Sequence, residues 1–355
     1  MSETKANPIL IVSTKNLSYV TGADFEGFWL LICENTIYVI TSKMIEGQIV
    51  QAIKESKISP RHLNNNIRYK IEIVTADKYF ADAVVDICSQ KNIKELVVDI
   101  TDVNYSIFQF LSGKLKEKEI ILCADDKTLA EKRITKDDEE IKNVQVACDI
   151  VSEVFNTIKR KVVPGMTELD IHFEIEKEFA MRHVIQSFKT IVATGPNSAN
   201  PHHSSGTRKV EEKDIVLIDM GCVYNGYCSD LTRTFFIGEP NEEYKKIWNT
   251  VKLAHDTALN EVKPGMNAAD IDMFARNIIV NAGYGEKFIH TTGHGVGLDI
   301  HEAPSIGKKS KDTLSKNMII TIEPGIYLDG KFGVRIEDTV LVTENNFKTL
   351  TSAEY

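Results

Sequence analysis

Lys213–Phe236 reads KDIVLIDMGCVYNGYCSDLTRTFF, and the interpretation of the whole chain starts from this stretch. An apolar run leads into Asp219, Asn225-Gly226 is the strongest dipeptide signal for a two-residue hairpin turn, and the returning strand carries Asp230. In such a hairpin Asp219 lies opposite Thr232 and shares a strand face with Asp230. Two carboxylates aimed at one point repel each other unless a cation lies between them, so the hairpin is a candidate half of a metal site. Taken alone, two ordinary aspartates on a solvated strand face explain the pattern equally well.

A helix-forming pattern occurs twice, 100 residues apart. Val163–Ile171 reads VPGMTELDI, and Lys263–Ile271 reads KPGMNAADI. In both copies Pro-Gly makes a turn, and the Thr or Asn that follows can cap the start of a helix. The two helices are predicted to bury matching apolar faces, made of Ile171, Ile175 and Phe179 in the first and of Ile271, Phe274 and Ile278 in the second.

The hairpin is repeated as well, 104 residues further on. Ile319–Gly325 matches the apolar run of the first hairpin, and Asp329-Gly330 matches its turn. Glu323 therefore replaces the first aspartate, and Glu337 roughly replaces the second. A duplicated unit with a pseudo-twofold axis gathers all four carboxylates at that axis, which makes an accidental pair of surface aspartates a poor explanation. A two-residue turn would leave Glu337 facing away from Glu323, so a bulge or a longer turn is expected between Gly330 and Glu337, with Gly333 as its predicted position.

Composition bounds the class of protein and its partners. The 355 residues predict two domains, or one large domain with an appendage. The net charge of −9 argues against nucleic acid and anionic membrane surfaces as partners. Residues 1–8 lack the apolar core of a signal peptide, and no apolar run is long enough to span a bilayer. Six scattered cysteines without a C-x-x-C pair predict free thiols. We therefore expect a cytoplasmic protein, because the cytoplasm keeps thiols reduced.

The first 127 residues alternate strand and helix patterns, which predicts a small α/β domain. Strands are predicted at 9–12, 71–74 and 96–100, a hairpin at 29–40, helices at 46–57 and 78–89, and an irregular segment at 17–22. The polar stretch 132–140 is predicted to be a connector, in which Asp137 and Glu140 form a capping box for a helix that ends near Lys159. The predicted domains are residues 1–127 and 128–355.

A histidine-rich and glycine-rich stretch, His290–Glu302, reads HTTGHGVGLDIHE. Its alternate glycines do not make a nucleotide-binding loop, because Leu298 replaces the last glycine of that pattern and no Walker lysine follows. Glycines on both sides of His294 let backbone and ligand approach closely, so its imidazole can join the four carboxylates. Such an oxygen-rich set favours Mn²⁺, Co²⁺ or Fe²⁺ and admits Zn²⁺, and its charge suits two divalent ions better than one.

Together these motifs resemble those of the pita-bread metallopeptidases, and among them the Xaa-Pro peptidases, which comprise the prolidases and the aminopeptidases P. The motifs are D-x-G at Asp219, S-D-x-T-R at 229–233, T-G-H-G-V-G-L-x-I-H-E at 292–302, I-E-P-G at 322–325 and G-V-R-I-E-D at 333–338. The resemblance covers essentially the whole chain. It implies an α+β protein in which a pseudo-twofold pita-bread domain, of the creatinase/aminopeptidase fold, follows a smaller creatinase-like α/β domain.

The resemblance also implies which residues hold metal. The expected ligands are Asp219, Asp230, His294, Glu323 and Glu337. Asp230 and Glu337 would bridge two divalent ions, Asp219 would complete one ion, and His294 with Glu323 would complete the other. Mn²⁺ is the expected metal, ahead of Co²⁺, Zn²⁺ and Fe²⁺.

The catalytic residues implied by the resemblance are His202, His301, Glu323 and Arg335. His202 would contact the scissile carbonyl, although the adjacent His203 leaves open which imidazole acts. His301 would hydrogen-bond the substrate, and Glu323 would pass a proton to the leaving nitrogen. Arg335 shares a strand face with a carboxylate ligand and would neutralise the acidic cluster, and Thr232 is placed to hydrogen-bond a ligand. The plain alternatives are a surface pair for His202 and His203, a core histidine with satisfied hydrogen bonds for His301, and a surface salt bridge for Arg335.

The implied activity is hydrolysis of the bond between an N-terminal residue and a following proline, by a hydroxide that bridges the two metals. The expected partners are a peptide with proline at its second position and a second copy of the chain in a homodimer. Residues 1–125 argue against a methionine aminopeptidase, which usually lacks such a domain. A non-catalytic binding protein of this fold would have replaced ligands, and a metal-independent hydrolase such as creatinase would lack the carboxylate set. Whether dipeptides or longer peptides are cut stays open.

Overall fold

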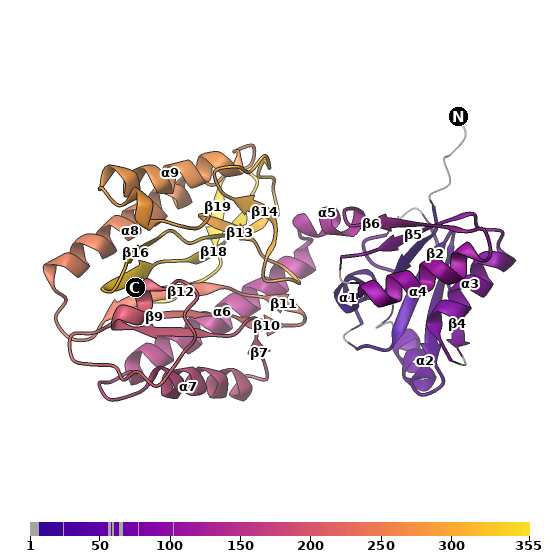
Figure 1. The fold of residues 1–355 in the computed structure, drawn as a ribbon, viewed down its shortest axis with the longest axis horizontal. Helices are drawn as coiled ribbons and strands as arrows, with labels where there is room; N and C mark the ends of the chain where they lie inside the picture. The colour runs from indigo at the N-terminus through magenta and orange to yellow at the C-terminus, as the bar shows by residue number, and fades with distance from the viewer. Residues whose placement is uncertain are drawn as a thin grey trace. The chain divides into compact units, whose positions relative to one another are not determined.

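Figure 1 shows a computed structural model of the chain, which describes residues 7–355 except 24, 56, 57, 59, 64–66, 77 and 102. The chain divides into two compact units, Met1–Lys132 and Arg133–Tyr355. The prediction about a signal peptide concerns residues that mostly lie outside the described part. No helix within the described ranges is long and apolar enough to cross a membrane.

The first unit is built on a six-stranded mixed sheet with the strand order β4-β3-β2-β1-β5-β6. Its strands are β1 (Ile9–Ile11), β2 (Phe28–Cys33), β3 (Thr36–Ser42), β4 (Lys70–Ala76), β5 (Glu95–Asp99) and β6 (Ile121–Asp125). Its helices are α1 (Thr14–Thr21), α2 (Glu46–Lys54), α3 (Phe80–Gln90) and α4 (Tyr105–Lys116), and α5 (Thr128–Ile134) leads into the second unit. Apolar side chains of α3 and α4, such as Val84 and Leu115, share a buried core with Leu96 and other side chains of the sheet.

Most predicted elements of this unit are present, and one prediction is wrong. The hairpin at 29–40 is the antiparallel pair of β2 and β3. The segment 17–22 is not irregular but forms the end of α1, which Ser13 caps at its start and Gly22 ends at a left-handed φ of 77°. The helix predicted at 46–57 is α2, which ends at Lys54, and residues 56 and 57 lie outside the described part.

The second unit contains four long helices and a set of strands between them. The helices are α6 (Asp138–Lys161), α7 (Glu168–Met181), α8 (Glu242–Asn260) and α9 (Ala268–Asn281). The capping box predicted for α6 is confirmed, since Asp137 and Glu140 exchange side-chain and backbone hydrogen bonds. In Figure 1, α7 and α9 lie at opposite edges of this unit, with strands between them.

The strands of the second unit form two main sheets and two smaller ones. Their bounds are β7 (Ile185–Gln186), β8 (Ile191–Thr194), β9 (Ile215–Met220), β10 (Cys222–Tyr224), β11 (Tyr227–Cys228), β12 (Leu231–Phe236), β13 (Gly293–Gly295), β14 (Glu302–Ile306), β15 (Ile319–Ile322), β16 (Gly325–Leu328), β17 (Phe332–Arg335), β18 (Asp338–Val342) and β19 (Phe347–Thr349). The main sheets have the orders β12-β9-β8 and β14-β13-β15-β18-β19. A short 3₁₀ helix, η1 (Gly195–Ala199), follows β8, and another, η2 (Gly285–Lys287), follows α9.

The predicted duplication appears in matching backbone contacts. The N–H of Gly165 donates to the carbonyl of Val210, and the N–H of Gly265 donates to the carbonyl of Leu314, both at 2.8 Å. Both glycines have left-handed φ angles, 98° and 86°, which explains why each copy has Gly after Pro. The two Pro-Gly turns therefore fasten α7 and α9 to their own halves of the unit in the same way.

The predicted buried face is correct for α7 and partly wrong for α9. Ile171, Ile175 and Phe179 are fully buried, as expected. In α9 only Ile271 of the predicted face is fully buried, and the other fully buried apolar positions are Ala268, Ala275 and Ile279. Phe274 and Ile278 are half-buried and pack at the margin of the core. The buried stripe of α9 is therefore rotated by about one residue from the predicted one.

The first hairpin has the predicted register. β10 and β11 pair across the two-residue turn Asn225-Gly226, whose residues have φ angles of 48° and 85°. Positive φ at both turn positions is what favours Asn-Gly in this place. The same register continues into β9 and β12, where Asp219 lies opposite Thr232.

The second hairpin turns through three residues rather than two. β16 and β17 pair Leu328 with Phe332, which leaves residues 329–331 in the turn. This register continues into β15 and β18 and brings Glu323 level with Glu337. The expectation of a longer turn is thus confirmed.

The predicted position of that irregularity at Gly333 is wrong. Gly333 lies inside β17, and a Cβ atom there would be 2.1 Å from the carbonyl oxygen of Ser198. The missing side chain therefore lets η1 approach the strand closely and has no part in the turn.

Candidate metal centre

The five candidate ligands come from both halves of the second unit. Asp219 lies in β9 and Asp230 lies just before β12, while His294 lies in β13. Glu323 directly follows β15, and Glu337 directly precedes β18. The two hairpins therefore supply two carboxylates each, and the glycine-flanked strand supplies the imidazole.

The structure brings these side chains into one cluster. Ligand atoms of Asp230, His294 and Glu337 all lie within 4.8 Å of one another. His294 Nε2 is 3.6 Å from Asp230 Oδ2 and 3.4 Å from Glu323 Oε1. The Nδ1–H of His294 donates to the carbonyl of Gly295 at 3.0 Å, which leaves the lone pair on Nε2 directed at the carboxylates.

Asp219 joins the cluster through Arg335. The Nη2 of Arg335 donates to Asp219 Oδ2 at 2.6 Å, and its Nε donates to Thr232 Oγ1 at 3.1 Å. Thr232 Oγ1 in turn donates to Glu337 Oε2 at 2.7 Å, as the sequence suggested for a threonine beside a ligand. One buried guanidinium and one hydroxyl thus connect carboxylates from the two hairpins.

Four carboxylates in so little space are electrostatically unfavourable. Burial, followed by the charges of Glu337, Asp219 and Glu323, raises the pKa of Asp230. Burial, followed by the charges of Glu323 and Asp219, raises the pKa of Glu337, and burial raises the pKa of Glu323. Arg335 balances only one of four negative charges, so the pocket needs further positive charge.

The donor set fits divalent metal ions. Asp219 Oδ1 is buried and has no hydrogen-bond partner among the described residues. Leaving such a group unpaired costs about 1–3 kcal/mol or more, which a bound cation would recover. Carboxylate oxygens with one imidazole nitrogen are ligands that Mn²⁺, Co²⁺, Fe²⁺ and Zn²⁺ all accept.

The predicted catalytic histidines lie on loops beside the cluster. The ring of His301 is 4.4 Å from the ring of His294, edge to face. Burial, followed by the charge of His294, lowers the pKa of His301, and His202 contributes in the same direction. His202 itself is exposed, whereas His203 is turned toward Glu168, with Nε2 2.7 Å from Oε2. The two adjacent histidines therefore have different surroundings.

Sequence reasoning missed two residues of this site, Tyr327 and His290. The Tyr327 hydroxyl accepts from Arg335 Nη1 at 2.9 Å and is 2.8 Å from His290 Nε2. Tyr327 lies four residues after Glu323, and His290 lies four residues before His294. Because side chains two or four residues apart share a strand face, that spacing could have found Tyr327.

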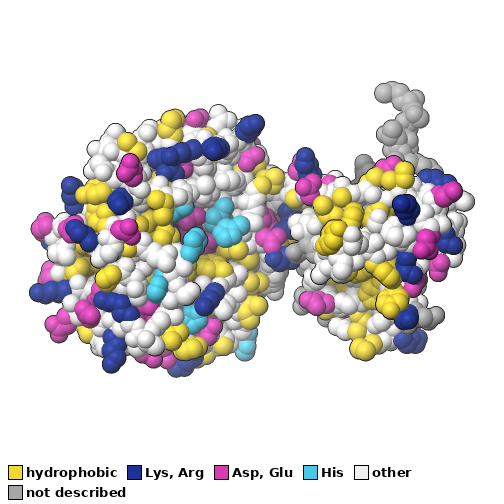
Figure 2. All heavy atoms as spheres, viewed as in Figure 1, with side chains coloured by type: hydrophobic (Ala, Val, Ile, Leu, Met, Phe, Trp, Pro, Cys, Tyr) yellow, Lys and Arg dark blue, Asp and Glu magenta, His cyan; other side chains and the backbone are white. Residues whose placement is uncertain are grey.

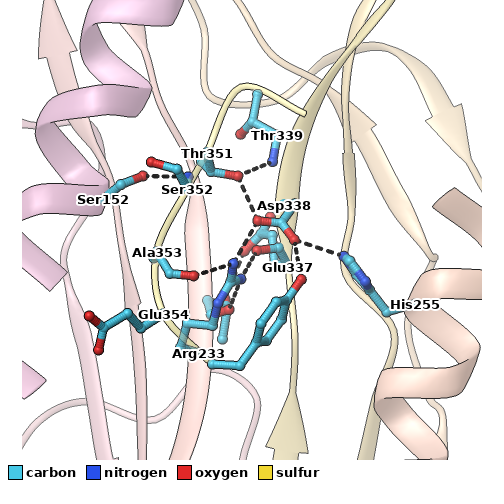
Figure 3. Close-up of polar contacts among 12 residues, drawn as sticks. Ser152, Arg233, His255, Glu337, Asp338, Thr339, Thr351, Ser352, Ala353 and Glu354 are labelled. Carbon is cyan, nitrogen blue, oxygen red and sulfur yellow. Dashed lines mark hydrogen bonds and ion pairs between the residues drawn. The ribbon is translucent and has the colours of Figure 1, made fainter. Parts of the chain in front are cut away.

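A second buried charge cluster is centred on Asp338, the residue that follows Glu337 in the chain (Figure 3). Asp338 Oδ1 accepts from Arg233 Nη2 and from Thr351 Oγ1, both at 2.7 Å, and Oδ2 accepts from the Tyr355 hydroxyl at 3.0 Å. Arg233 Nη1 also donates to the backbone carbonyl of Glu337 at 2.5 Å. The C-terminal segment 351–355 is thereby fastened to the backbone of a candidate ligand.

A cavity of about 630 Å³ shares one residue, His290, with the surroundings of the cluster, and none of the five candidate ligands lines it. Ser305, which lies opposite His294 in the β13–β14 pair, lines the cavity together with His290. Lys308, Lys309 and Lys311 line it as well, and all three are exposed. On the second unit, Figure 2 shows histidine side chains gathered on one face.

This architecture and donor set define the class of pita-bread metallopeptidases, and comparison with known proteins agrees. Residues 142–344 match the sequence profile of metallopeptidase family M24. A relative named Xaa-Pro dipeptidase, from Pyrococcus furiosus, is 36% identical over 100% of this chain and 96% of its own length. The chain belongs to metallopeptidase family M24.

Solved structures agree with this membership over both units. The Xaa-Pro dipeptidase from Bacillus anthracis superposes with a TM-score of 0.90 at 31% identity, covering 98% of this chain and 93% of that one. The X-Pro aminopeptidase from Thermotoga maritima superposes with a TM-score of 0.87 at 31% identity, covering 98% of this chain and 96% of that one. The predicted fold, a pita-bread unit after a smaller α/β unit, is thus confirmed.

Proposed function

We propose that this enzyme hydrolyses the peptide bond between an N-terminal residue and a following proline. The observation that carries the proposal is the buried cluster of four carboxylates and one imidazole, in a chain that matches Xaa-Pro peptidases along nearly its whole length. The first unit supports this choice over a methionine aminopeptidase. The two names borne by relatives, dipeptidase and aminopeptidase, leave substrate length to experiment.

The residues that would hold metal are Asp219, Asp230, His294, Glu323 and Glu337. Bound divalent metal supplies Lewis-acid chemistry, which activates water and polarises the scissile carbonyl. We propose two ions, with Mn²⁺ ahead of Co²⁺, Zn²⁺ and Fe²⁺, because four carboxylates carry more charge than one divalent ion balances.

The surrounding residues would handle the substrate and its protons. His202 and His301 would hydrogen-bond the carbonyl oxygen where negative charge develops. The proline nitrogen in such a bond carries no hydrogen, so it must receive a proton to leave, and Glu323 would deliver it. Arg335 holds Asp219 in place and keeps positive charge inside the acidic cluster.

The first test compares Gly-Pro with a longer Xaa-Pro-Xaa peptide, each with Mn²⁺, with EDTA, and with EDTA followed by excess Mn²⁺. We expect proline-dependent cleavage that EDTA abolishes and Mn²⁺ restores. A peptide with alanine in place of proline serves as the matched control. Cleavage that survives EDTA, or equal rates with alanine, would overturn the proposal, and stoichiometric metal analysis would separate an enzyme from a binding protein.

Cytoplasmic location and a homodimer are part of this proposal. The described part of the chain contains no disulfide among its six cysteines, which suits a reducing compartment. Light scattering of the purified protein measures the mass directly, and a mass of one chain would overturn the dimer.

A further inference from the structure

We infer that Glu168 is a positioning residue for this reaction: it anchors the loop that carries His202, and His203 is the partner of Glu168 rather than a group that touches substrate. The inference rests on the proposed function, because it assumes that His202 contacts the scissile carbonyl. It also answers the question that the two adjacent histidines raise in the sequence.

Glu168 is the first residue of α7, and its side chain is completely buried. One oxygen, Oε1, accepts from the N–H of Thr194 at 2.9 Å, from the Thr194 hydroxyl at 3.1 Å and from Asn197 Nδ2 at 2.8 Å. The other, Oε2, accepts from His203 Nε2–H at 2.7 Å and from the N–H of Gly206 at 2.8 Å. Both oxygens of one carboxylate are therefore committed to a single loop.

The positions of these partners show what the carboxylate does. They span residues 194–206 and lie on both sides of His202 along the chain, so the loop closes around Glu168. Burial acts to raise the pKa of Glu168, but the hydrogen bonds from Asn197, His203, Thr194 and Gly206 outweigh it and lower the pKa. The carboxylate thus stays ionised, and charge-assisted hydrogen bonds are roughly twice as strong as neutral ones.

A second anchor fixes the same loop to the metal-centre strands. The buried hydroxyl of Ser198 accepts from the N–H of Gly333 at 2.9 Å, two residues before Arg335 in β17. Between these anchors, the N–H of His202 donates to Asn200 Oδ1 at 3.1 Å, while its ring is exposed. His202 is therefore an exposed imidazole on a backbone held from both sides.

The contact with Glu168 separates the roles of the two histidines. His203 is 17% exposed at its side chain, and its Nε2–H is already donated to a fully buried carboxylate. Turning this nitrogen toward substrate would leave a buried charge short of a partner, which is costly. Among the described residues the ring of His202 has no such hydrogen-bond partner, so His202 is the imidazole available to the substrate.

The test is a double-mutant cycle on the full-length, metal-loaded enzyme with an Xaa-Pro substrate. We expect His202→Ala to lower kcat about 100- to 1000-fold, as loss of an oxyanion donor does. We expect His203→Ala to lower kcat about 10- to 100-fold with little change in KM, because a displaced loop misplaces His202. In the His202→Ala background, His203→Ala should cause no further loss, since nothing remains to be positioned.

The conservative variant separates positioning from catalysis. His203→Gln keeps an N–H donor at the reach of Nε2, so we expect kcat within about threefold of wild type. His183→Asn, an exposed histidine after α7, is the matched control and should change nothing. Additive losses from His202→Ala and His203→Ala, or a His203→Gln enzyme as slow as His203→Ala, would overturn the inference.

A readout without substrate keeps this inference apart from the proposed function. Hydrogen–deuterium exchange of peptides covering residues 194–206 should be faster in Glu168→Gln and His203→Ala than in wild type, and unchanged in His203→Gln. Unchanged exchange in Glu168→Gln would overturn the anchor even if Xaa-Pro cleavage is found. Faster exchange in an enzyme that cleaves no Xaa-Pro bond would instead keep the anchor and remove the proposed reaction.

Discussion

At the scale of single residues, the metal centre is built from groups that are unfavourable on their own. Asp230 and Glu337 are 5% and 2% exposed, and each faces other carboxylates rather than a matching number of cations. Removing one charge from such a cluster relieves repulsion in the metal-free protein while it removes a metal ligand. Stability and activity should therefore respond in opposite directions to the same substitution.

Asp230→Asn should abolish measurable turnover without destabilising the metal-free protein. In EDTA we expect its Tm to equal or exceed that of wild type, because one of four like charges is gone. Excess Mn²⁺ should then raise the Tm of wild type, where metal at 100 times Kd adds about 2.7 kcal/mol, but raise that of the variant much less. Thermal scans with and without metal measure these Tm values, and Asp149→Asn on the exposed face of α6 is the control. Full activity of Asp230→Asn would refute the assignment of Asp230 as a metal ligand.

Glu168 should make the protein more sensitive to acid. Its folded pKa lies below the ordinary value, so its contribution to stability is fully present above the unfolded pKa of about 4.3 and is lost as pH falls through the folded pKa. Between pH 6 and pH 3 the Tm of wild type should therefore fall more steeply than that of Glu168→Gln. Parallel curves over this range would contradict the hydrogen-bonded, ionised state of the carboxylate.

At the scale of elements, local sequence chemistry predicted what local contacts decide. A two-residue hairpin turn needs positive φ at both positions, and Asn225-Gly226 tolerates this. The first turn and the pairing of Asp219 with Thr232 could therefore be predicted directly. The second turn was correctly predicted to differ from the first, but its irregularity was predicted at the wrong residue. Asp329-Gly330 fits a two-residue or a three-residue turn equally well. What selects Gly333 is the approach of Ser198, a residue 135 positions away. Such contacts leave no local signal.

The same limit applies to two contacts within the site. His203 meets Glu168 across 35 positions, and His290 meets Tyr327 across 37. Motif spacing predicted the four candidate carboxylate ligands, because their order along two repeated hairpins reflects one duplicated geometry. It did not show which of two neighbouring histidines is held by a buried carboxylate, since that depends on how α7 packs beside β8.

The C-terminal segment gives a prediction at this scale, centred on Asp338 (Figure 3). Asp338→Asn should destabilise the protein by about 3–5 kcal/mol, because it leaves the guanidinium of Arg233 buried without its carboxylate. Tyr355→Phe removes only one hydrogen bond to Asp338 and keeps the ring stacked 4.3 Å from the Arg233 guanidinium, so it should cost about 1 kcal/mol. Urea unfolding of the metal-free variants measures both, and equal losses would contradict the central role given to the ion pair.

At the scale of the whole molecule, duplication explains how the chain can fold with so dense a cluster of like charges. Each half folds around its own core, one under α6 and α7 and the other under α8 and α9. Each half then presents two carboxylates at its hairpin, so the repulsion arises only where two separately stabilised halves meet. The burial of many apolar side chains offsets the free energy of this repulsion, and metal binding removes the repulsion.

The charge of the molecule also bears on substrate length. Against a net charge of −9, Lys308, Lys309 and Lys311 line the cavity that His290 also lines, and none of the three forms an ion pair with another described residue. A peptide extending past its proline into this cavity would bring a C-terminal carboxylate toward three cations, whereas its N-terminal amine would be repelled. We therefore predict that a substrate reaching this cavity is a peptide longer than a dipeptide that ends in a free carboxylate.

Replacing Lys308, Lys309 and Lys311 together by Gln should therefore raise KM for an Xaa-Pro-Xaa peptide with a free carboxylate. Exposed charge pairs are worth about 0.2–1 kcal/mol each, so three of them predict an increase of about threefold or more, which high salt should reproduce in wild type. The same peptide with a C-terminal amide should show no such difference. A charge-matched control replaces exposed lysines of the other half, Lys142, Lys177 and Lys209, and should leave both KM values unchanged. If the amide and the acid respond equally to the cavity variant, the lysines act on the general field of the site rather than on the end of the peptide.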